Sequence, residues 1–345
     1  MRRPATPAVT ALVAAAAVAL VATLSGCVPE PAPSATVTTS PKPDPTLTTP
    51  PTLTGDAVAP GALPPAVFGG QCPTALSSSD IDDVVGTDMT PYSTDTEASV
   101  SNVGGITCMW TGTDAALTVT ILPRSGIGAA QLSDAARRQF FQDCDPALFC
   151  SWVWEDDDLW VSGTFQFLPN MSQSTVDAWG QDLGDTVAAN FAAAREAPWV
   201  RDTTGWWPVR ECSQVASAVA AELNASVTGA TATYPDQPAP GVALADIASH
   251  RTWCALTVPG ASIPLTVNLF AGEAWFVREA EGDKAFDTQV DGVTGYRLAS
   301  YDGSASNSFS FTDGVNRVRI DVPGDARASV EDLARAVARA AASGF

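Results

Sequence analysis

The stretch Trp152-Val-Trp-Glu-Asp-Asp-Asp-Leu-Trp-Val161 decides the fold of this chain. Aromatic residues alternate along its first part, an acidic turn follows, and a second apolar segment leaves the turn, which is the pattern of a β-hairpin. Residues 309–318, with the sequence Phe-Ser-Phe-Thr-Asp-Gly-Val-Asn-Arg-Val, align with it without a gap. The chain therefore contains two copies of one predicted hairpin, which indicates an internal repeat.

The segments before the two hairpins also follow a common order. In each half a cysteine, Cys72 or Cys212, precedes a short predicted helix, over 77–85 or 215–223. A polar loop comes next, followed by a predicted strand in which a second cysteine lies near a tryptophan. The remaining segments before each hairpin are an alternating strand and a helical or irregular stretch: 117–121 and 128–143 in the first half, 265–269 and 273–286 in the second.

A predicted amphipathic helix closes each half. Its apolar residues are spaced for one face of a helix: Val176, Trp179, Leu183, Val187 and Phe191, then Val330, Leu333, Val337 and Ala341. This order of strands and helices predicts an α+β fold with two related domains, each an antiparallel sheet packed with helices. We expect the first domain over 66–198 and the second over 199–345.

The first 26 residues are typical of an export signal. Arg2 and Arg3 precede an apolar run over 11–24, which is short for a transmembrane helix of about 20 apolar residues. The run ends in Leu-Ser-Gly-Cys at 24–27, which resembles the bacterial lipobox. That resemblance implies that the thiol of Cys27 receives a diacylglyceryl group and that Cys27 becomes the first residue after cleavage. We therefore expect a lipoprotein anchored through its acyl chains, such as palmitate, to the outer face of the cell membrane.

The segment over 27–65 is rich in proline, threonine, serine and alanine. Such a composition buries too little apolar surface to offset the entropy lost on ordering. We interpret it as a tether between the lipid anchor and the folded domains.

The chain has seven cysteines, an odd number that needs an explanation in an exported protein. If Cys27 carries lipid, six remain, and an even set in an oxidising compartment is expected to pair. The repeat predicts equivalent disulfides in the two halves and leaves one pair over. The predicted bridges are Cys72–Cys108, Cys212–Cys254 and Cys144–Cys150.

The net charge of −20, with only two lysines, argues against nucleic acid as a partner. The same charge argues against binding of the folded domains to anionic lipid. We therefore expect the membrane contact to run through lipidated Cys27, and an unknown ligand or protein of the cell envelope to be the partner.

Signals for catalysis are weak. His250 is the single histidine, which excludes a multi-histidine metal site, and no Gly-x-Ser-x-Gly motif accompanies it as a general base. The acidic run over 155–158 lacks the spacing of a calcium-binding loop and is interpreted as a charged hairpin tip. We expect no metal, no cofactor and no enzymatic activity.

Two groups of tryptophans are the candidate binding residues. Trp152, Trp154 and Trp160 alternate on the first hairpin, where they form either a ligand platform or part of the core. The second group lies between the predicted domains, where it forms either a binding surface or the contact between the domains: Trp199, Trp206 and Trp207.

The lipobox, the Pro/Thr-rich tether, the early cysteine before a short helix and the later cysteine in a strand resemble a family of actinobacterial secreted lipoproteins of unknown function. The order is also broadly similar to the extracellular sensor domains of some mycobacterial kinases. Two tandem copies and the pair of Cys144 and Cys150 depart from the single-domain pattern of the family. We predict a non-enzymatic envelope lipoprotein that binds or senses a ligand or partner. The alternatives are a structural or assembly role in protein docking, and an envelope hydrolase.

Overall fold

The computed structural model describes residues 55–93, 96–142, 144–145, 148–168, 171–232, 239–278, 282–299 and 305–344. The predicted signal peptide, Cys27 and the first part of the tether lie outside these residues. The described part of the chain has helices together with two larger antiparallel sheets and one two-stranded parallel sheet, so the predicted α+β fold is confirmed.

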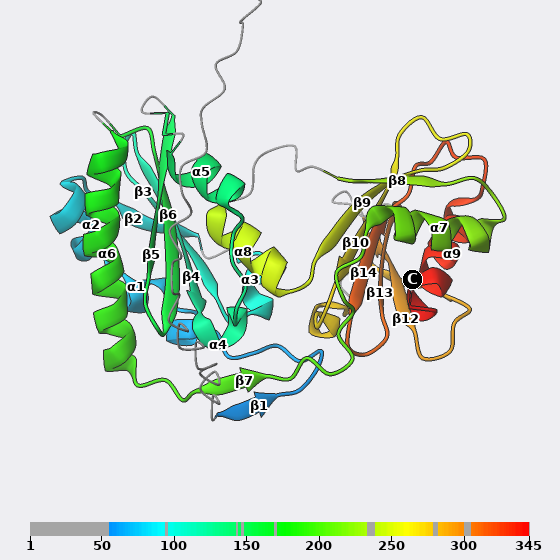
Figure 1. Ribbon diagram of the computed structural model, residues 1–345, viewed down its shortest axis with the longest axis horizontal. Coiled ribbons are helices and arrows are strands. Elements are labelled where there is room, and N and C mark those ends of the chain that lie inside the picture. Colours follow the sequence, from blue (N-terminus) through cyan, green and yellow to red (C-terminus); the bar gives the residue numbers. More distant parts are fainter. Residues whose placement is uncertain are drawn as a thin grey trace, which may run out of the picture. The chain divides into compact units, whose positions relative to one another are not determined.

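The first half forms a five-stranded antiparallel sheet in the order β2-β3-β4-β6-β5. Helix α6 (Gln173–Ala194) lies along one face of it (Figure 1) and packs with the short helices α1 (Cys72–Ala75) and α2 (Ser78–Val85). The strands are β2 (Thr90–Ser93), β3 (Ile106–Thr111), β4 (Ala116–Pro123), β5 (Phe149–Glu155) and β6 (Leu159–Gln166).

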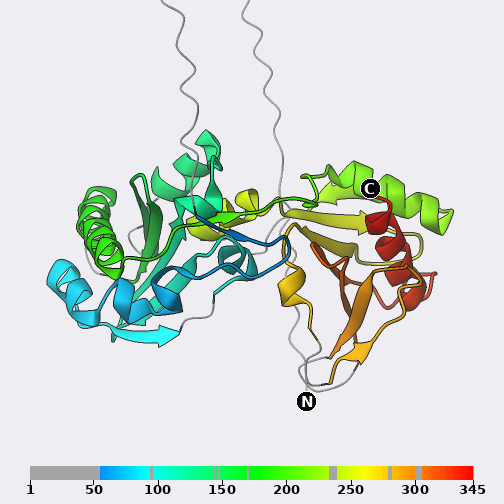
Figure 2. The ribbon, with the colours of Figure 1, turned by 90° about the horizontal axis from the view of Figure 1, so that it is seen from below.

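The second half forms a seven-stranded antiparallel sheet in the order β8-β9-β10-β14-β13-β12-β11. Helices α7 (Cys212–Leu223) and α9 (Val330–Ala342) pack against each other and against this sheet (Figures 1 and 2). The strands are β8 (Thr228–Thr231), β9 (Thr252–Thr257), β10 (Leu265–Phe270), β11 (Lys284–Ala285), β12 (Thr294–Ala299), β13 (Ala305–Thr312) and β14 (Arg317–Asp321).

The two sheets share their strand order and their register. Each predicted hairpin is present, as β5–β6 and β13–β14, and the strand order of the first sheet recurs in the second, which adds β12 and β11 at its edge. One row of paired residues crosses four strands in each sheet, and the two rows match the gap-free alignment of the hairpins: Cys108, Val119, Gly163 and Trp152, then Cys254, Val267, Ile320 and Phe309.

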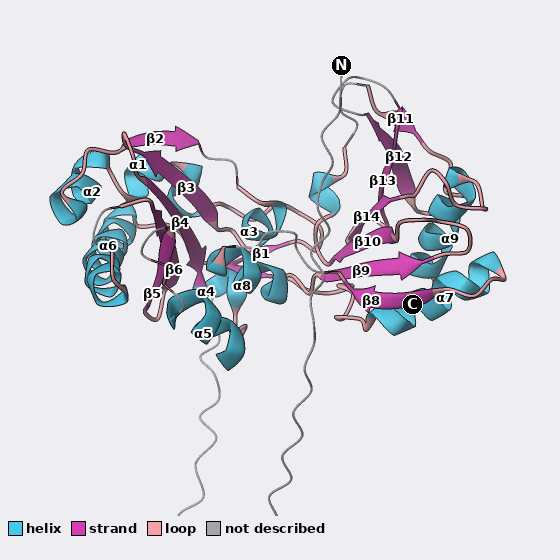
Figure 3. Ribbon diagram, turned by 90° about the horizontal axis from the view of Figure 1, so that it is seen from above, coloured by secondary structure: helices cyan, strands magenta, loops and turns pink. Residues whose placement is uncertain are grey.

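Two helices lie where polar loops were expected. Helix α3 (Ala98–Asn102) and helix α8 (Pro240–Ala248) precede the cysteine-bearing strands, and they pack against each other (Figure 3). Helix α8 also covers β4 and β6 of the first sheet, beside α4 (Arg124–Ile127). A buried cluster therefore combines residues of both halves: Val100, Val103, Leu122, Ile127, Leu132, Trp160, Val242, Leu244 and Ala245.

The predicted tether over 27–65 includes residues that belong to the folded part. Strand β1 (Asp56–Val58) lies within it and pairs in parallel with β7 (Trp199–Arg201). The first helix of the folded part, η1 (Val67–Gly70), follows a few residues later, and the remaining short elements are α5 (Asp134–Gln142) and η2 (Ala274–Phe276). The fold therefore begins earlier than Ala66, because β1 already pairs with β7.

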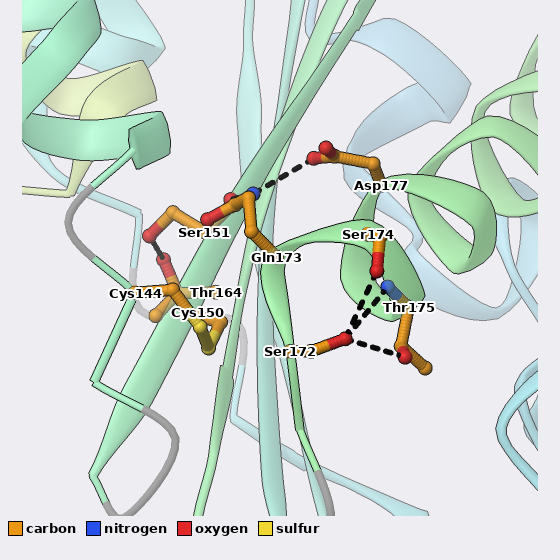
Figure 4. Close-up of a disulfide and its surroundings, with 9 residues drawn as sticks. All are labelled: Cys144, Cys150, Ser151, Thr164, Ser172, Gln173, Ser174, Thr175 and Asp177. Atoms are coloured by element: carbon orange, nitrogen blue, oxygen red, sulfur yellow. Dashed lines mark hydrogen bonds between the residues drawn. A yellow bond between two sulfur atoms is a disulfide. The ribbon is translucent and has the colours of Figure 1, made fainter.

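The three predicted disulfides are present, as Cys72–Cys108, Cys144–Cys150 and Cys212–Cys254. One of the two equivalent bridges joins the start of α1 to β3, and the other joins the start of α7 to β9. All four cysteines are buried. The short bridge lies at the start of β5 (Figure 4).

Polar contacts next to the short disulfide fix the start of α6 on the sheet (Figure 4). Ser172 is the N-cap, and its Oγ accepts a hydrogen bond of 3.2 Å from the Thr175 N–H. The Gln173 Nε2 donates to the Ser151 carbonyl of β5 at 2.9 Å and to Asp177 Oδ1 at 2.7 Å. These bonds tie the first turn of α6 to the edge strand of the sheet.

The indole of Trp152 lies between two glycines, and this close packing gives a prediction. A Cβ built on Gly180 of α6 would lie 2.6 Å from Trp152 Cδ2, and a Cβ built on Gly163 of β6 would lie 2.4 Å from Cε2. Alanine at Gly180 should therefore destabilise the protein by about 1–3 kcal/mol through overpacking, although alanine is the better helix former by about 1 kcal/mol. Chemical unfolding checks the sign. Gln181→Ala, at the next and exposed position of α6, is the control and should cost less than about 0.5 kcal/mol.

Among the residues described, no helix combines the length and the apolar composition needed to cross a membrane.

Candidate functional site

A pocket of about 560 Å³ lies between the start of α3 and the second sheet. Its sheet wall is the face opposite α7 and α9. This follows from side-chain alternation along the strands, because Val267 and Val318 belong to the core under those helices while Asn268 and Arg317 line the pocket. We call it the arginine pocket, after three of its lining residues: Arg251, Arg317 and Arg319.

The shared register shows how this face of the second sheet differs from the equivalent face of the first. Phe270 and Arg317 are a cross-strand pair of β10 and β14, and the equivalent pair in the first sheet is Leu122 and Trp160. Leu122 and Trp160 are buried in the cluster that α8 covers. At the equivalent place in the second sheet an arginine replaces the tryptophan. Phe270 and Arg317 are still only 5% and 4% exposed, and both line the pocket.

The arginines of the pocket alternate with aromatic rings. The Arg317 guanidinium lies 4.0 Å from the centroid of Phe270 and 4.2 Å from that of Phe276. The Arg251 guanidinium lies 4.9 Å from the Phe270 centroid and 5.6 Å from that of Trp253. Guanidinium groups stacked on rings at such distances are attracted to the ring faces, more strongly where water is excluded. The stacking therefore holds two of the cations in place on the sheet.

Two carboxylates behind the pocket partly balance these cations. Arg317 Nη2 lies 2.7 Å from Glu273 Oε2, and the Glu273 side chain is completely buried. Arg251 Nη1 contacts both oxygens of Asp246, at 3.1 and 3.0 Å, and its Nη2 donates to Asn268 Oδ1 at 3.3 Å. Burial raises the pKa of Glu273 to about 7, although the nearby charges of Arg317 and Arg251 act to lower it.

The raised pKa of Glu273 gives a prediction about stability and pH. In the unfolded chain this carboxyl has its ordinary pKa of 4.5, whereas in the folded protein the pKa is about 7. Folding therefore favours the neutral form of this carboxyl. The contribution of Glu273 to the free energy of unfolding is full below pH 4.5 and is lost as the pH rises through 7. From pH 4 to pH 8, wild type should lose about 3 kcal/mol of unfolding free energy relative to Glu273→Gln. Chemical unfolding of both proteins across this range checks it, and a constant difference would contradict it.

Of the two alternatives for the tryptophans of the first hairpin, a ligand platform or part of the core, the structure supports the core for Trp152 and Trp160. Trp152 and Trp160 are 0% and 1% exposed, because they are core residues on opposite faces of the sheet. Trp154 is half-buried against α6, and its Nε1 donates to Asp185 Oδ1 at 3.0 Å. Packing accounts for the positions of all three residues.

The tryptophans of the linker lie at contacts within the folded chain. Trp199, in β7, is buried. Trp206 is half-buried, with the Arg201 guanidinium 5.2 Å from its ring centroid, and Trp207 is half-buried against the core under α7 and α9. Arg201 itself donates to Asn102 of α3 at 2.8 Å and to the Gly272 carbonyl at 2.9 Å. None of the six candidate tryptophans lines the arginine pocket, which instead contains Trp253.

The other candidate groups have structural contacts. His250 is half-buried, its Nδ1 lies 3.2 Å from the Trp207 carbonyl oxygen, and its ring meets that of Trp206 edge to face. The acidic run forms the turn between β5 and β6, where Glu155 pairs with Arg124 at 2.6 Å. Asp156 Oδ1 accepts from the backbone N–H groups of Asp158 and Leu159, at 2.9 and 2.7 Å. In the described ranges, no group of three or more His, Cys, Asp or Glu side chains is placed to hold a metal ion.

Comparison with known proteins gives no match, whether to a family model, to a curated protein or to a solved structure. The resemblance to actinobacterial lipoproteins therefore stays a prediction from the sequence.

Proposed function

We propose that this chain is an exported, lipid-anchored protein of the outer face of the cell membrane, and that it binds a small ligand without catalysing a reaction. The sequence Leu-Ser-Gly-Cys at 24–27 supports the anchor. The three disulfides suit an oxidising compartment outside the cytoplasm.

The arginine pocket is the observation that carries the binding role. Ligand pockets of proteins typically have volumes of about 300–1,000 Å³, mostly apolar or aromatic walls and a few placed polar groups. The arginine pocket has about 560 Å³, which lies in this range, but nine of its thirteen lining residues are polar or charged. Its apolar part comes from the rings of three aromatic residues, on which the guanidinium groups of Arg317 and Arg251 stack. A preformed site of this kind needs little reorganisation to receive a ligand.

We also propose that the two halves arose by duplication of one domain. Their common strand order, register and disulfide positions support this. In this account, binding evolved where the second copy exchanged a buried apolar pair for Phe270 and Arg317.

A thermal unfolding experiment tests the binding role. Small molecules extracted from the envelope of the producing cells should raise the unfolding temperature of the purified protein. At a hundredfold excess over the dissociation constant, the rise should be about 5 °C. Trp253→Ala should abolish the rise, because its ring is part of the pocket wall.

His250→Ala is the matched control in this experiment and tests the non-enzymatic part of the proposal. His250 does not line the arginine pocket, so its alanine variant should show the same rise in unfolding temperature as wild type. Chemical change of an extracted compound by the wild-type protein, lost in His250→Ala, would favour the hydrolase alternative instead.

A further inference from the structure

The walls of the arginine pocket are positive within a strongly negative protein. The lining residues carry a net charge of only +1, from three arginines against Glu97 and Asp321, within a chain of net charge −20. Behind them, Asp246 pairs with Arg251 and Glu273 pairs with Arg317. Arg319, whose contact with Asp321 is the longest of the three at 3.8 Å, is therefore the cation of the wall that is best placed to attract an anionic ligand.

Two buried polar groups of the wall have hydrogen-bonding capacity to spare. Arg317 is 4% exposed and Ser99 is 2% exposed. Within the described part of the chain, neither Arg317 Nε nor Ser99 Oγ has a hydrogen-bond partner. An unpaired buried polar group destabilises the fold, and a ligand oxygen that reached either atom would remove that cost.

Arg319 supplies a third, more accessible cation. Its side chain is 49% exposed, and its Nη2 lies 3.8 Å from Asp321 Oδ1, beyond normal hydrogen-bonding distance. The ion pair of Arg319 is thus weaker than that of Arg317, whose Nη2 lies 2.7 Å from Glu273 Oε2. A carboxylate or phosphate could accept charge-assisted hydrogen bonds from Arg319 without breaking a buried ion pair.

Aromatic surface lies beside these cations. Phe276 is 46% exposed and Trp253 is half-buried, and both line the pocket. Exposed ring surface of this kind can stack on a flat apolar group of a ligand.

We propose that the arginine pocket binds a small anion that also carries a flat apolar group, with the anionic oxygens at Arg317 and Arg319 and the flat group against Trp253 and Phe276. This inference rests on the proposed ligand-binding function and specifies its ligand class. A carboxylate and a phosphate share the recognised chemistry, so the test contains both.

The test uses ligand-observed NMR on the purified protein with four probes: benzoate, benzyl alcohol, benzylammonium and inorganic phosphate. Benzoate should bind at least tenfold more tightly than benzyl alcohol or benzylammonium, because only benzoate places negative charge at the guanidinium groups. Phosphate should compete with benzoate but bind more weakly, because it has no ring. Arg319→Gln should weaken benzoate binding about tenfold, the loss of one charge-assisted interaction.

Arg339→Gln is the matched control, because it removes the same charge from α9, on the opposite face of the sheet, where Arg339 pairs with Glu222 at 2.6 Å. Benzoate binding should be unchanged in that variant. Equal binding of benzoate and benzyl alcohol, or unchanged binding in Arg319→Gln, would overturn the ligand class. If the envelope extract stabilises the protein while benzoate does not bind, only this inference fails; if neither acts, the proposed function fails with it.

Discussion

Replacement of Cys27 by alanine should release the protein from the membrane fraction almost completely. Under our proposal, the acyl chains on Cys27 supply the membrane affinity, at about 0.8 kcal/mol for each buried CH₂ group, and stable anchoring takes more than one chain. The rest of the chain is not expected to replace them, because the net charge of the whole chain is −20 and negative charge is repelled by anionic lipid. Fractionation of cells, followed by mass spectrometry of the N-terminal peptide, measures both the location and the lipid.

Ser34→Ala, in the predicted tether, is the control for this experiment and should leave the protein at the membrane. The alanine variant of Cys27 should also retain its signal sequence or be cut at another position, because the cysteine is part of the predicted recognition sequence. A Cys27→Ala protein that stays in the membrane fraction with the mass of the wild-type mature protein would contradict the anchor.

Loss of the Cys212–Cys254 disulfide should have the second-largest effect. The bridge closes a loop with a sequence separation of 42, for which the chain-entropy account gives about 4 kcal/mol of stability. The double variant Cys212→Ser/Cys254→Ser should lose about that much unfolding free energy, a large fraction of the 5–15 kcal/mol of a typical domain. Denaturant unfolding, with and without a reductant, measures the loss.

The Cys144–Cys150 bridge provides the comparison inside the same protein. Its sequence separation is 6, so the double serine variant should lose only about 2 kcal/mol. Equal losses in the two variants would show that loop closure is not the main source of stabilisation. Peptide mapping without reduction should recover the three pairs and no bridge between the halves.

Much of the fold could be predicted because its signals are local or repeat. The hairpin at 152–161 combines alternating aromatic residues with an acidic turn. Its gap-free match at 309–318 predicts equivalent registers in the two sheets, and the pairs of β6 with β4 and of β14 with β10 have them. The pairing of the six cysteines followed from the same repeat. The Ser77 capping box, in which Ser77 and Asp80 bond reciprocally, likewise marks the start of α2 in the sequence.

Helix α8 could not be predicted in this way, because its role depends on the other half of the chain. It is apolar over most of Pro240–Ala248, yet it lacks the polar face that marks an amphipathic helix. Gly241 lets it approach β4 closely, since a Cβ there would lie 2.4 Å from the Thr120 Cβ. Contacts between segments so distant in sequence leave no periodic signal in either one.

The sequence did not reveal the arginine pocket, because the candidate binding residues were chosen for their tryptophan content and these tryptophans lie mostly in the core. Alternating aromatic residues on a strand occur in both cores and binding surfaces, and Trp152 and Trp160 proved to be buried. A useful signal is present in the alignment of the two hairpins, in which Arg317 occupies the position equivalent to Trp160. A charged residue at the equivalent of a buried position indicates a partnered charge or a pocket wall, and Arg317 pairs with Glu273 and lines the pocket.

Fluorine NMR of the protein labelled with 5-fluorotryptophan tests the central claim, ligand binding in the arginine pocket, most directly. The ten tryptophans place labels in the core, the linker and the pocket, and Trp253→Phe assigns the pocket resonance. When the envelope extract is added, we predict that the Trp253 resonance shifts while that of buried Trp152 does not. A spectrum in which Trp253 is unchanged, or in which linker tryptophans such as Trp206 shift instead, would contradict the account.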